Sequence, residues 1–135
     1  MSKCYLLPLH CGISVSNIEA SINWYREFLD FELISCKDMP MLKAKVAFIK
    51  HGNFEIELFE HYESNALPVD RLIPNLDIKT QGTKHICFQV ENIDSLINRF
   101  QGEAVDVVIG PMMVERDYVA FIRDNNGTLI EFIQR

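Results

Sequence analysis

The 135-residue chain lacks the features that mark several specialised classes of protein. It has no apolar run near the roughly 20 residues that a membrane-spanning helix needs, so we expect no membrane partner. Its net charge of −6 leaves no basic excess, which argues against binding nucleic acid. The opening residues MSKCYLLPLH hold one lysine and a short apolar run, too little for a secretory signal. The four cysteines show no C-x-x-C pairing, which favours reduced thiols and a cytoplasmic protein.

What the chain does have is an internal repeat. Residues 10–25, HCGISVSNIEASINWY, align with residues 85–100, HICFQVENIDSLINRF, and VAFIK at 46–50 aligns with VAFIR at 119–123. Its composition, 48% hydrophobic and 24% charged, is that of an ordinary globular protein. Because a repeat of fixed period determines the architecture, we expect one domain over residues 1–135 made of two similar modules.

Each repeat has the pattern of a strand, a helix and three further strands. This predicts an α+β fold of two βαβββ modules in tandem, over residues 5–62 and 83–135, joined by a linker over residues 63–82. In the first module we expect strands at 6–15, 31–38, 43–52 and 53–62, with a helix capped by Ser16 or Asn17. In the second we expect strands at 84–90, 105–110, 116–124 and 128–134, a helix capped by Asn92, and a turn holding Met112 and Met113.

Each repeat also carries one histidine and one glutamate in register. Glu57 follows His10 by 47 residues, and Glu131 follows His85 by 46. Strand alternation places each histidine on a small, polar face, and Glu131 lies in the apolar run Leu129–Ile133, where an unpartnered carboxylate is costly. If the repeat symmetry brings the four side chains together, they form a set of two imidazoles and two carboxylates. Such a set suits one divalent ion per site, among nickel, zinc, cobalt, manganese and iron.

The arrangement resembles the vicinal oxygen chelate superfamily, which includes glyoxalase I, methylmalonyl-CoA epimerase, bleomycin-binding proteins and ring-cleaving dioxygenases. The motifs that carry the resemblance are WYREFLDFEL, IELFE, KHICFQVENID and AFIRDNNGTLIEFIQ, and they span nearly the whole chain. The resemblance implies paired modules whose sheets curl into a cup-shaped, incomplete β-barrel. It implies a homodimer, and it implies that His10, Glu57, His85 and Glu131 are the metal ligands.

A carboxylate at Glu57 resembles the glyoxalase and epimerase branch, in which four protein side chains hold the metal. By that resemblance the protein is a lyase or isomerase for a small substrate with vicinal oxygens, similar to lactoylglutathione lyase. Proton transfer would pass through an enediolate, with Glu57 or Glu131 as the base. A methylmalonyl-CoA-epimerase-like enzyme and a non-catalytic binding or resistance protein of the same fold are the alternatives.

One departure leaves the use of glutathione open. Where relatives that use glutathione have an arginine and an asparagine for its carboxylates, this chain has Ser14 and His61. Neither side chain offers the two-pronged donor of a guanidinium group. For Met112 and Met113, which follow Gly110–Pro111, a flexible apolar lid and core filling are the two alternatives. The residues expected to contact the substrate are Ser14, Phe59, Cys87, Gln89 and Met112.

Overall fold

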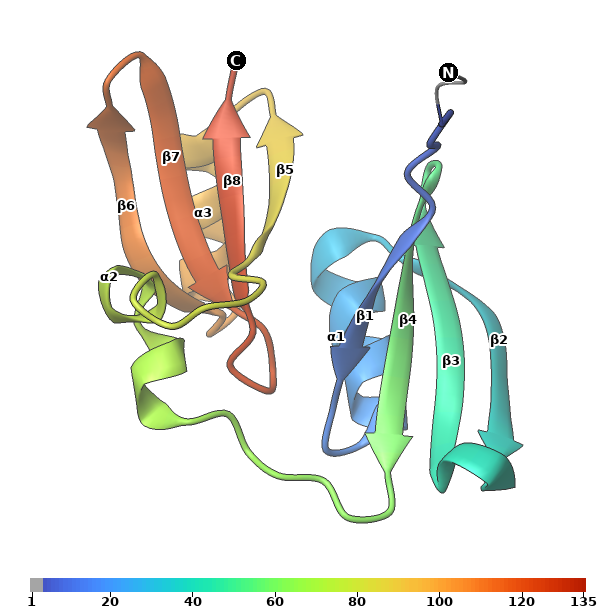
Figure 1. Ribbon diagram of the computed structural model, residues 1–135. Helices are drawn as coiled ribbons and strands as arrows, with labels where there is room; N and C mark the ends of the chain where they lie inside the picture. Colours follow the sequence, from blue (N-terminus) through green and yellow to red (C-terminus); the bar gives the residue numbers. More distant parts are fainter. Residues whose placement is uncertain (1–3) are drawn as a thin grey trace. The chain divides into compact units, whose positions relative to one another are not determined.

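The computed structural model describes residues 4–135, and it divides into two compact units between Asn65 and Ala66 (Figure 1). Each unit is a four-stranded mixed sheet with one helix packed on it, so the predicted α+β fold of two βαβββ modules is confirmed. In the described residues, no helix is long and apolar enough to cross a membrane.

The first module runs in the order strand, helix, three strands. Its elements are β1 (His10–Ser14), α1 (Ile18–Leu29), β2 (Glu32–Met39), a 3₁₀ turn at Pro40–Leu42, β3 (Ala44–His51) and β4 (Phe54–His61). The strand order in the sheet is β1-β4-β3-β2, with β1 parallel to β4 and the other pairs antiparallel.

The second module repeats this topology. Its elements are β5 (Ile86–Val90), α3 (Ile93–Gly102), β6 (Asp106–Val114), β7 (Asp117–Arg123) and β8 (Leu129–Gln134). The order β5-β8-β7-β6 matches that of the first sheet, and β5 again runs parallel to the last strand. The turn between β7 and β8 holds Gly127, which adopts the positive φ (91°) that an L side chain disfavours.

Equivalent side chains fix the two helices. Asn17 accepts a hydrogen bond from the amide of Ala20, as Asn92 does from that of Ser95, so both modules use the asparagine cap. A side chain from the last strand of each sheet also binds the first helical amide. Glu60 accepts from Ile18 at 2.6 Å, and Gln134 accepts from Ile93 at 2.9 Å.

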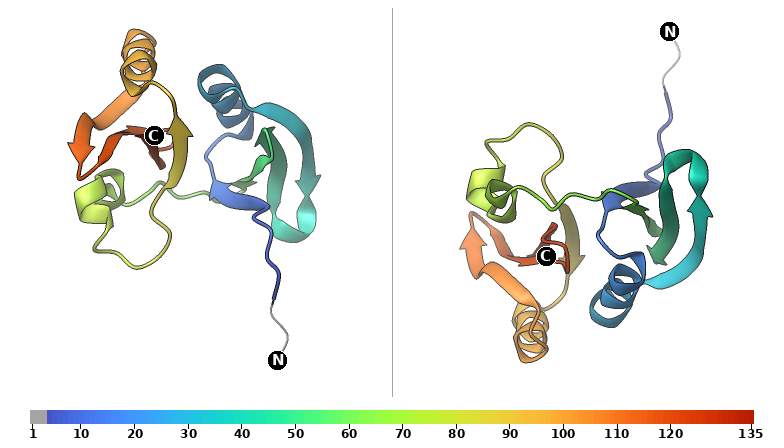
Figure 2. Two further views of the ribbon diagram at one scale, coloured as in Figure 1. Left: turned by 90° about the horizontal axis from the view of Figure 1, so that it is seen from above. Right: turned by 90° about the horizontal axis from the view of Figure 1, so that it is seen from below.

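Each helix buries its apolar side against one face of its own sheet (Figure 2). The helical residues that the periodicity assigns to the core are buried in both modules, namely Ile18, Ile22 and Tyr25 in α1 and Ile93, Ile97 and Phe100 in α3. Ile56 and Leu58 of β4 are fully buried on the helix side. The opposite face, which carries the histidine and glutamate of each repeat, is here called the His–Glu face.

Two predicted boundaries are wrong. The first strand begins at His10 rather than near residue 6, because β1 pairs only with Glu55–Phe59 of β4 and the preceding residues 4–9 have no strand partner. Met112 and Met113 do not lie in a turn. They belong to β6, which continues past Gly110–Pro111 after a shift of register opposite β7, so the apolar lid predicted there is a strand.

The linker contains two short helices and a buried carboxylate. The helices are η2 (Val69–Leu72), a 3₁₀ helix, and α2 (Pro74–Asp77). The Asp77 side chain is 2% exposed and forms ion pairs with Arg71 at 2.9 Å and with Lys84 at 3.1 Å. Burial would raise the pKa of Asp77, but hydrogen bonds and charge from both cations outweigh it and lower that pKa.

Asp77→Asn is therefore expected to lower the free energy of unfolding by about 3 kcal/mol at neutral pH, because two cations lose a buried partner. A lowered pKa means that the stabilisation is complete above about pH 4 and is lost as the pH falls through the folded-state pKa. Urea unfolding at pH 7 and pH 3 measures both effects. Asp70→Asn, at an exposed position of the same segment, is the control, and equal losses in the two variants would contradict the prediction.

Candidate functional site

Each module brings its histidine and glutamate into contact. His10 Nε2 lies 3.3 Å from Glu57 Oε1, and His85 Nε2 lies 3.1 Å from Glu131 Oε1. The same ring nitrogen meets the same carboxylate oxygen in both modules, so the repeat preserves the geometry as well as the residue types. In the first module His10 lies on β1 and Glu57 on β4, the two parallel strands of the sheet. In the second module Glu131 lies on β8, and His85 directly precedes β5, the parallel neighbour of β8.

A phenylalanine holds each histidine ring. Phe48 meets His10 edge to face with ring centroids 5.4 Å apart, and Phe121 meets His85 in the same way at 5.1 Å. Phe48 lies directly opposite Glu57 across the strands, as Phe121 lies opposite Glu131. Each sheet thus presents a repeated triad of histidine, glutamate and phenylalanine. The repeated segments VAFIK and VAFIR contain the two phenylalanines, so the sequence did mark them as equivalent. They were not predicted as site residues, because an aromatic residue on a strand is usually a core residue.

The exposure of the four polar side chains suits a site that a small molecule can reach. His10 and Glu57 are 31% and 23% exposed, and His85 and Glu131 are 29% and 17% exposed. They are therefore screened from bulk water without being sealed from it.

The donor atoms fit a divalent metal. With ligand bonds near 2.1 Å, neighbouring donors around a metal are about 2.9 to 3.4 Å apart, from octahedral to tetrahedral angles. Both nitrogen–oxygen separations, 3.3 and 3.1 Å, fall in this range. Within residues 4–135 the structure shows no cluster of three or more histidine, cysteine or acidic side chains placed for a metal. Each module by itself thus offers two candidate ligands, one imidazole and one carboxylate.

The candidate substrate contacts lie on or beside the His–Glu faces. Ser14 ends β1 on the same side as His10, and the Phe59 ring lies two residues along β4 from Glu57, packed against Gly12. Gln89 shares a face of β5 with Cys87, two residues away, and Met112 of β6 lies opposite Val119 of β7. Their contact with a substrate stays a prediction.

Cys87 lies directly across from Glu131 in the strand pair. Partial burial of the thiol and then the neighbouring Glu131 carboxylate raise the pKa of Cys87 to about 11. The thiol is therefore protonated at neutral pH, which makes Cys87 a poor nucleophile and a weak hydrogen-bond donor.

Comparison with known proteins identifies the family. The family model described as Glyoxalase/Bleomycin resistance protein/Dioxygenase superfamily matches residues 8–132. The chain belongs to this superfamily. Its relatives include the lactoylglutathione lyase of Neisseria meningitidis, 26% identical over 131 residues that cover 94% of this chain and 89% of the relative. The probable lactoylglutathione lyase of Synechocystis is 29% identical over 132 residues, or 93% of each chain.

Solved structures confirm the fold. A glyoxalase I mutant from Zea mays superposes with a TM-score of 0.76 at 22% identity, over 95% of this chain. The chain spans 45% of that maize protein. At this identity the likeness establishes the tandem βαβββ architecture of the glyoxalase superfamily and leaves the chemistry to the residues of this chain.

Proposed function

We propose that this protein is a divalent-metal-dependent lyase or isomerase of the glyoxalase type, acting on a small substrate with two adjacent oxygens. The observation that carries the proposal is the repeated pair of histidine and glutamate, at 3.3 Å in one module and 3.1 Å in the other, each set against a phenylalanine. The glyoxalase relatives support the choice of reaction class.

His10, Glu57, His85 and Glu131 would together hold the metal, either from one chain or from two chains of a homodimer. When bound, the metal supplies Lewis-acid stabilisation of negative charge on adjacent substrate oxygens. The choice among nickel, zinc, cobalt, manganese and iron is left to measurement, because an imidazole and carboxylate set suits all five.

The proton is moved by a glutamate of this set. Glu131 is the less exposed of the two carboxylates, so water competes less for its proton. In this scheme Glu131 takes the proton from one substrate carbon, giving the enediolate, and returns it to the neighbouring carbon. Phe121 supports the step indirectly by fixing the His85 ring.

Metal content tests the first part of the proposal. Protein purified without a histidine tag is expected to contain about one transition metal ion per chain by mass spectrometry, and Glu57→Gln/Glu131→Gln is expected to contain almost none. Glu55→Gln is the matched control, since it removes a carboxylate two residues from Glu57 on the same strand. Wild-type protein that stays free of metal after incubation with nickel, zinc, cobalt, manganese and iron would exclude the proposal.

A further inference from the structure

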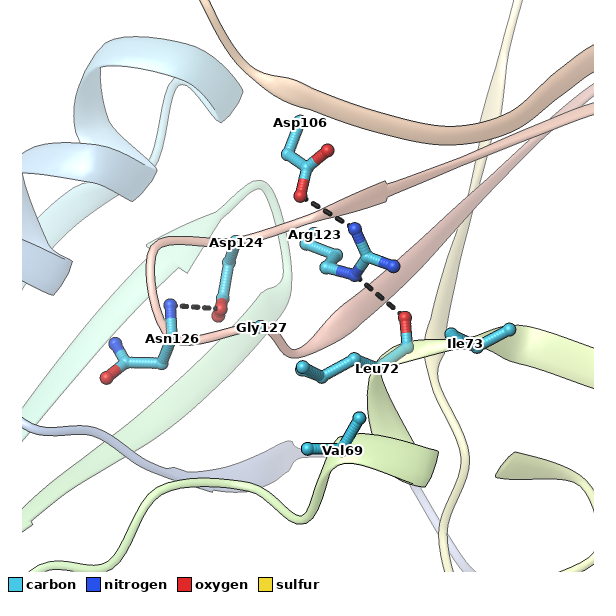
Figure 3. Close-up of a pocket in the computed structure, with 8 residues that line it drawn as sticks. All are labelled: Val69, Leu72, Ile73, Asp106, Arg123, Asp124, Asn126 and Gly127. Carbon is cyan, nitrogen blue, oxygen red and sulfur yellow. Dashed lines mark hydrogen bonds and ion pairs between the residues drawn. The ribbon is translucent and has the colours of Figure 1, made fainter. Parts of the chain in front are cut away.

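The second module has a cavity that the site described above does not use. Residues 69–73 of the linker lie against one end of the second sheet and form, with β6, β7 and the β7–β8 turn, a cavity of about 440 Å³ that is open to solvent (Figure 3). Val69, Leu72 and Ile73 supply an aliphatic wall. Arg123, Asp106 and Asp124 supply the polar side.

One residue that lines the cavity, Arg123, lies two residues along β7 from the residue paired with Glu131, on the same face of the sheet. Arg123 lies opposite Leu129 in the strand pair, and the next pair on that face is Phe121 opposite Glu131. Two residues along a strand correspond to roughly 7 Å, the length of a few bonded atoms. A substrate whose reacting oxygens lie at Glu131 therefore has the cavity within reach of its next few atoms.

The linker is what makes this cavity. In the first module the equivalent cross-strand pair is Glu32 opposite Lys50, and both side chains are exposed. In the second module the pair is Asp106 opposite Arg123, and Arg123 Nε donates to the carbonyl of Leu72 at 2.7 Å. The linker thus contacts this sheet position in the second module, whereas the equivalent pair in the first module is exposed.

The charges of the cavity determine what it accepts. Arg123 Nη1 donates to Asp106 at 2.8 Å, and the third guanidinium nitrogen makes no bond to the other residues drawn in Figure 3. One Asp124 oxygen accepts from the backbone amides of Asn126 and Thr128, which keeps this carboxylate in the turn. With one cation and two carboxylates the cavity repels a free carboxylate, while the third guanidinium nitrogen suits a neutral carbonyl oxygen.

We propose that this cavity is the subsite for an uncharged, aliphatic arm of the substrate that carries a carbonyl acceptor, such as an amide. The position of the reacting end rests on the proposed function. The chemical class of the arm rests on the cavity alone. A carrier thiol with a neutral amide is therefore preferred over glutathione, whose ends carry carboxylates.

Binding of unreactive thioethers tests the subsite without turnover. S-methyl-N-acetylcysteamine, which is neutral and has one amide, is titrated by NMR against the metal-loaded protein, and S-methylglutathione is titrated in parallel. Val69→Trp places an indole in the cavity from a position that is 76% exposed. Leu76→Trp, at a 40% exposed position of the same linker outside the cavity lining, is the matched control.

We expect the neutral thioether to bind more tightly than the glutathione thioether, and its affinity to fall at least 10-fold in Val69→Trp while Leu76→Trp is unchanged. Equal affinities in the two variants, tighter binding of the glutathione thioether or no binding to wild type would each overturn the subsite. Failure of every methylglyoxal hemithioacetal to react, with binding that still depends on Val69, would overturn the proposed function and leave the subsite standing.

Discussion

Glutamine in place of Glu131 is expected to lower kcat by about 10³-fold on a hemithioacetal that the wild-type enzyme converts. The amide keeps the size of the side chain and one oxygen that can bind a metal, but it does not accept a proton under these conditions. The loss should therefore appear in kcat more than in KM, because the group acts in the transition state. Steady-state kinetics at saturating metal measures the change.

The comparison with Glu57→Gln separates metal binding from proton transfer. If Glu57 only holds the metal, excess metal should restore part of the activity of Glu57→Gln and none of that of Glu131→Gln. Glu55→Gln, on the same strand as Glu57, should keep wild-type rates. Full turnover in Glu131→Gln together with loss in Glu57→Gln would assign the base to Glu57. Full turnover in both would exclude proton transfer by either carboxylate.

Much of each half of this site is predictable from the sequence. Strand alternation and the repeat place His10 with Glu57 and His85 with Glu131, and the structure brings both pairs within 3.3 Å. The helix caps follow from the preference of asparagine for the position before the first helical turn. These features depend on local spacing, which a single sequence records directly.

Other features depend on tertiary contacts that follow neither the helical nor the strand periodicity of the sequence. Phe48 and Phe121 look like core residues until the strand register sets them opposite the glutamates. The order of the linker depends on Asp77, whose ion pairs with Arg71 and Lys84 join residues six and seven positions away without a helical or strand pattern. The cavity beside Arg123 forms because the linker is held in this conformation, so the sequence alone gives no signal for the cavity.

Alanine in place of either His10 or His85 is expected to abolish activity, which is the largest effect proposed for a single substitution. Each module supplies one histidine and one glutamate to the proposed site, and catalytic metal sites of this kind use at least three protein ligands. Removing one histidine should weaken metal binding and leave the fold intact, because both rings are about a third exposed and lie outside the helix side of the sheets. Metal content and circular dichroism check the two halves of this expectation.

Mixing the two inactive variants then shows which chains build a site. If one subunit's His10 and Glu57 meet the other subunit's His85 and Glu131, a mixed dimer of His10→Ala and His85→Ala regains one intact site. Random exchange makes half of the dimers mixed, so activity should return to about a quarter of wild type. If one chain supplies all four ligands, every site in the mixture lacks a histidine and activity stays at zero. Recovery well above a quarter would contradict both arrangements, because it would require a site that works with three of the four side chains.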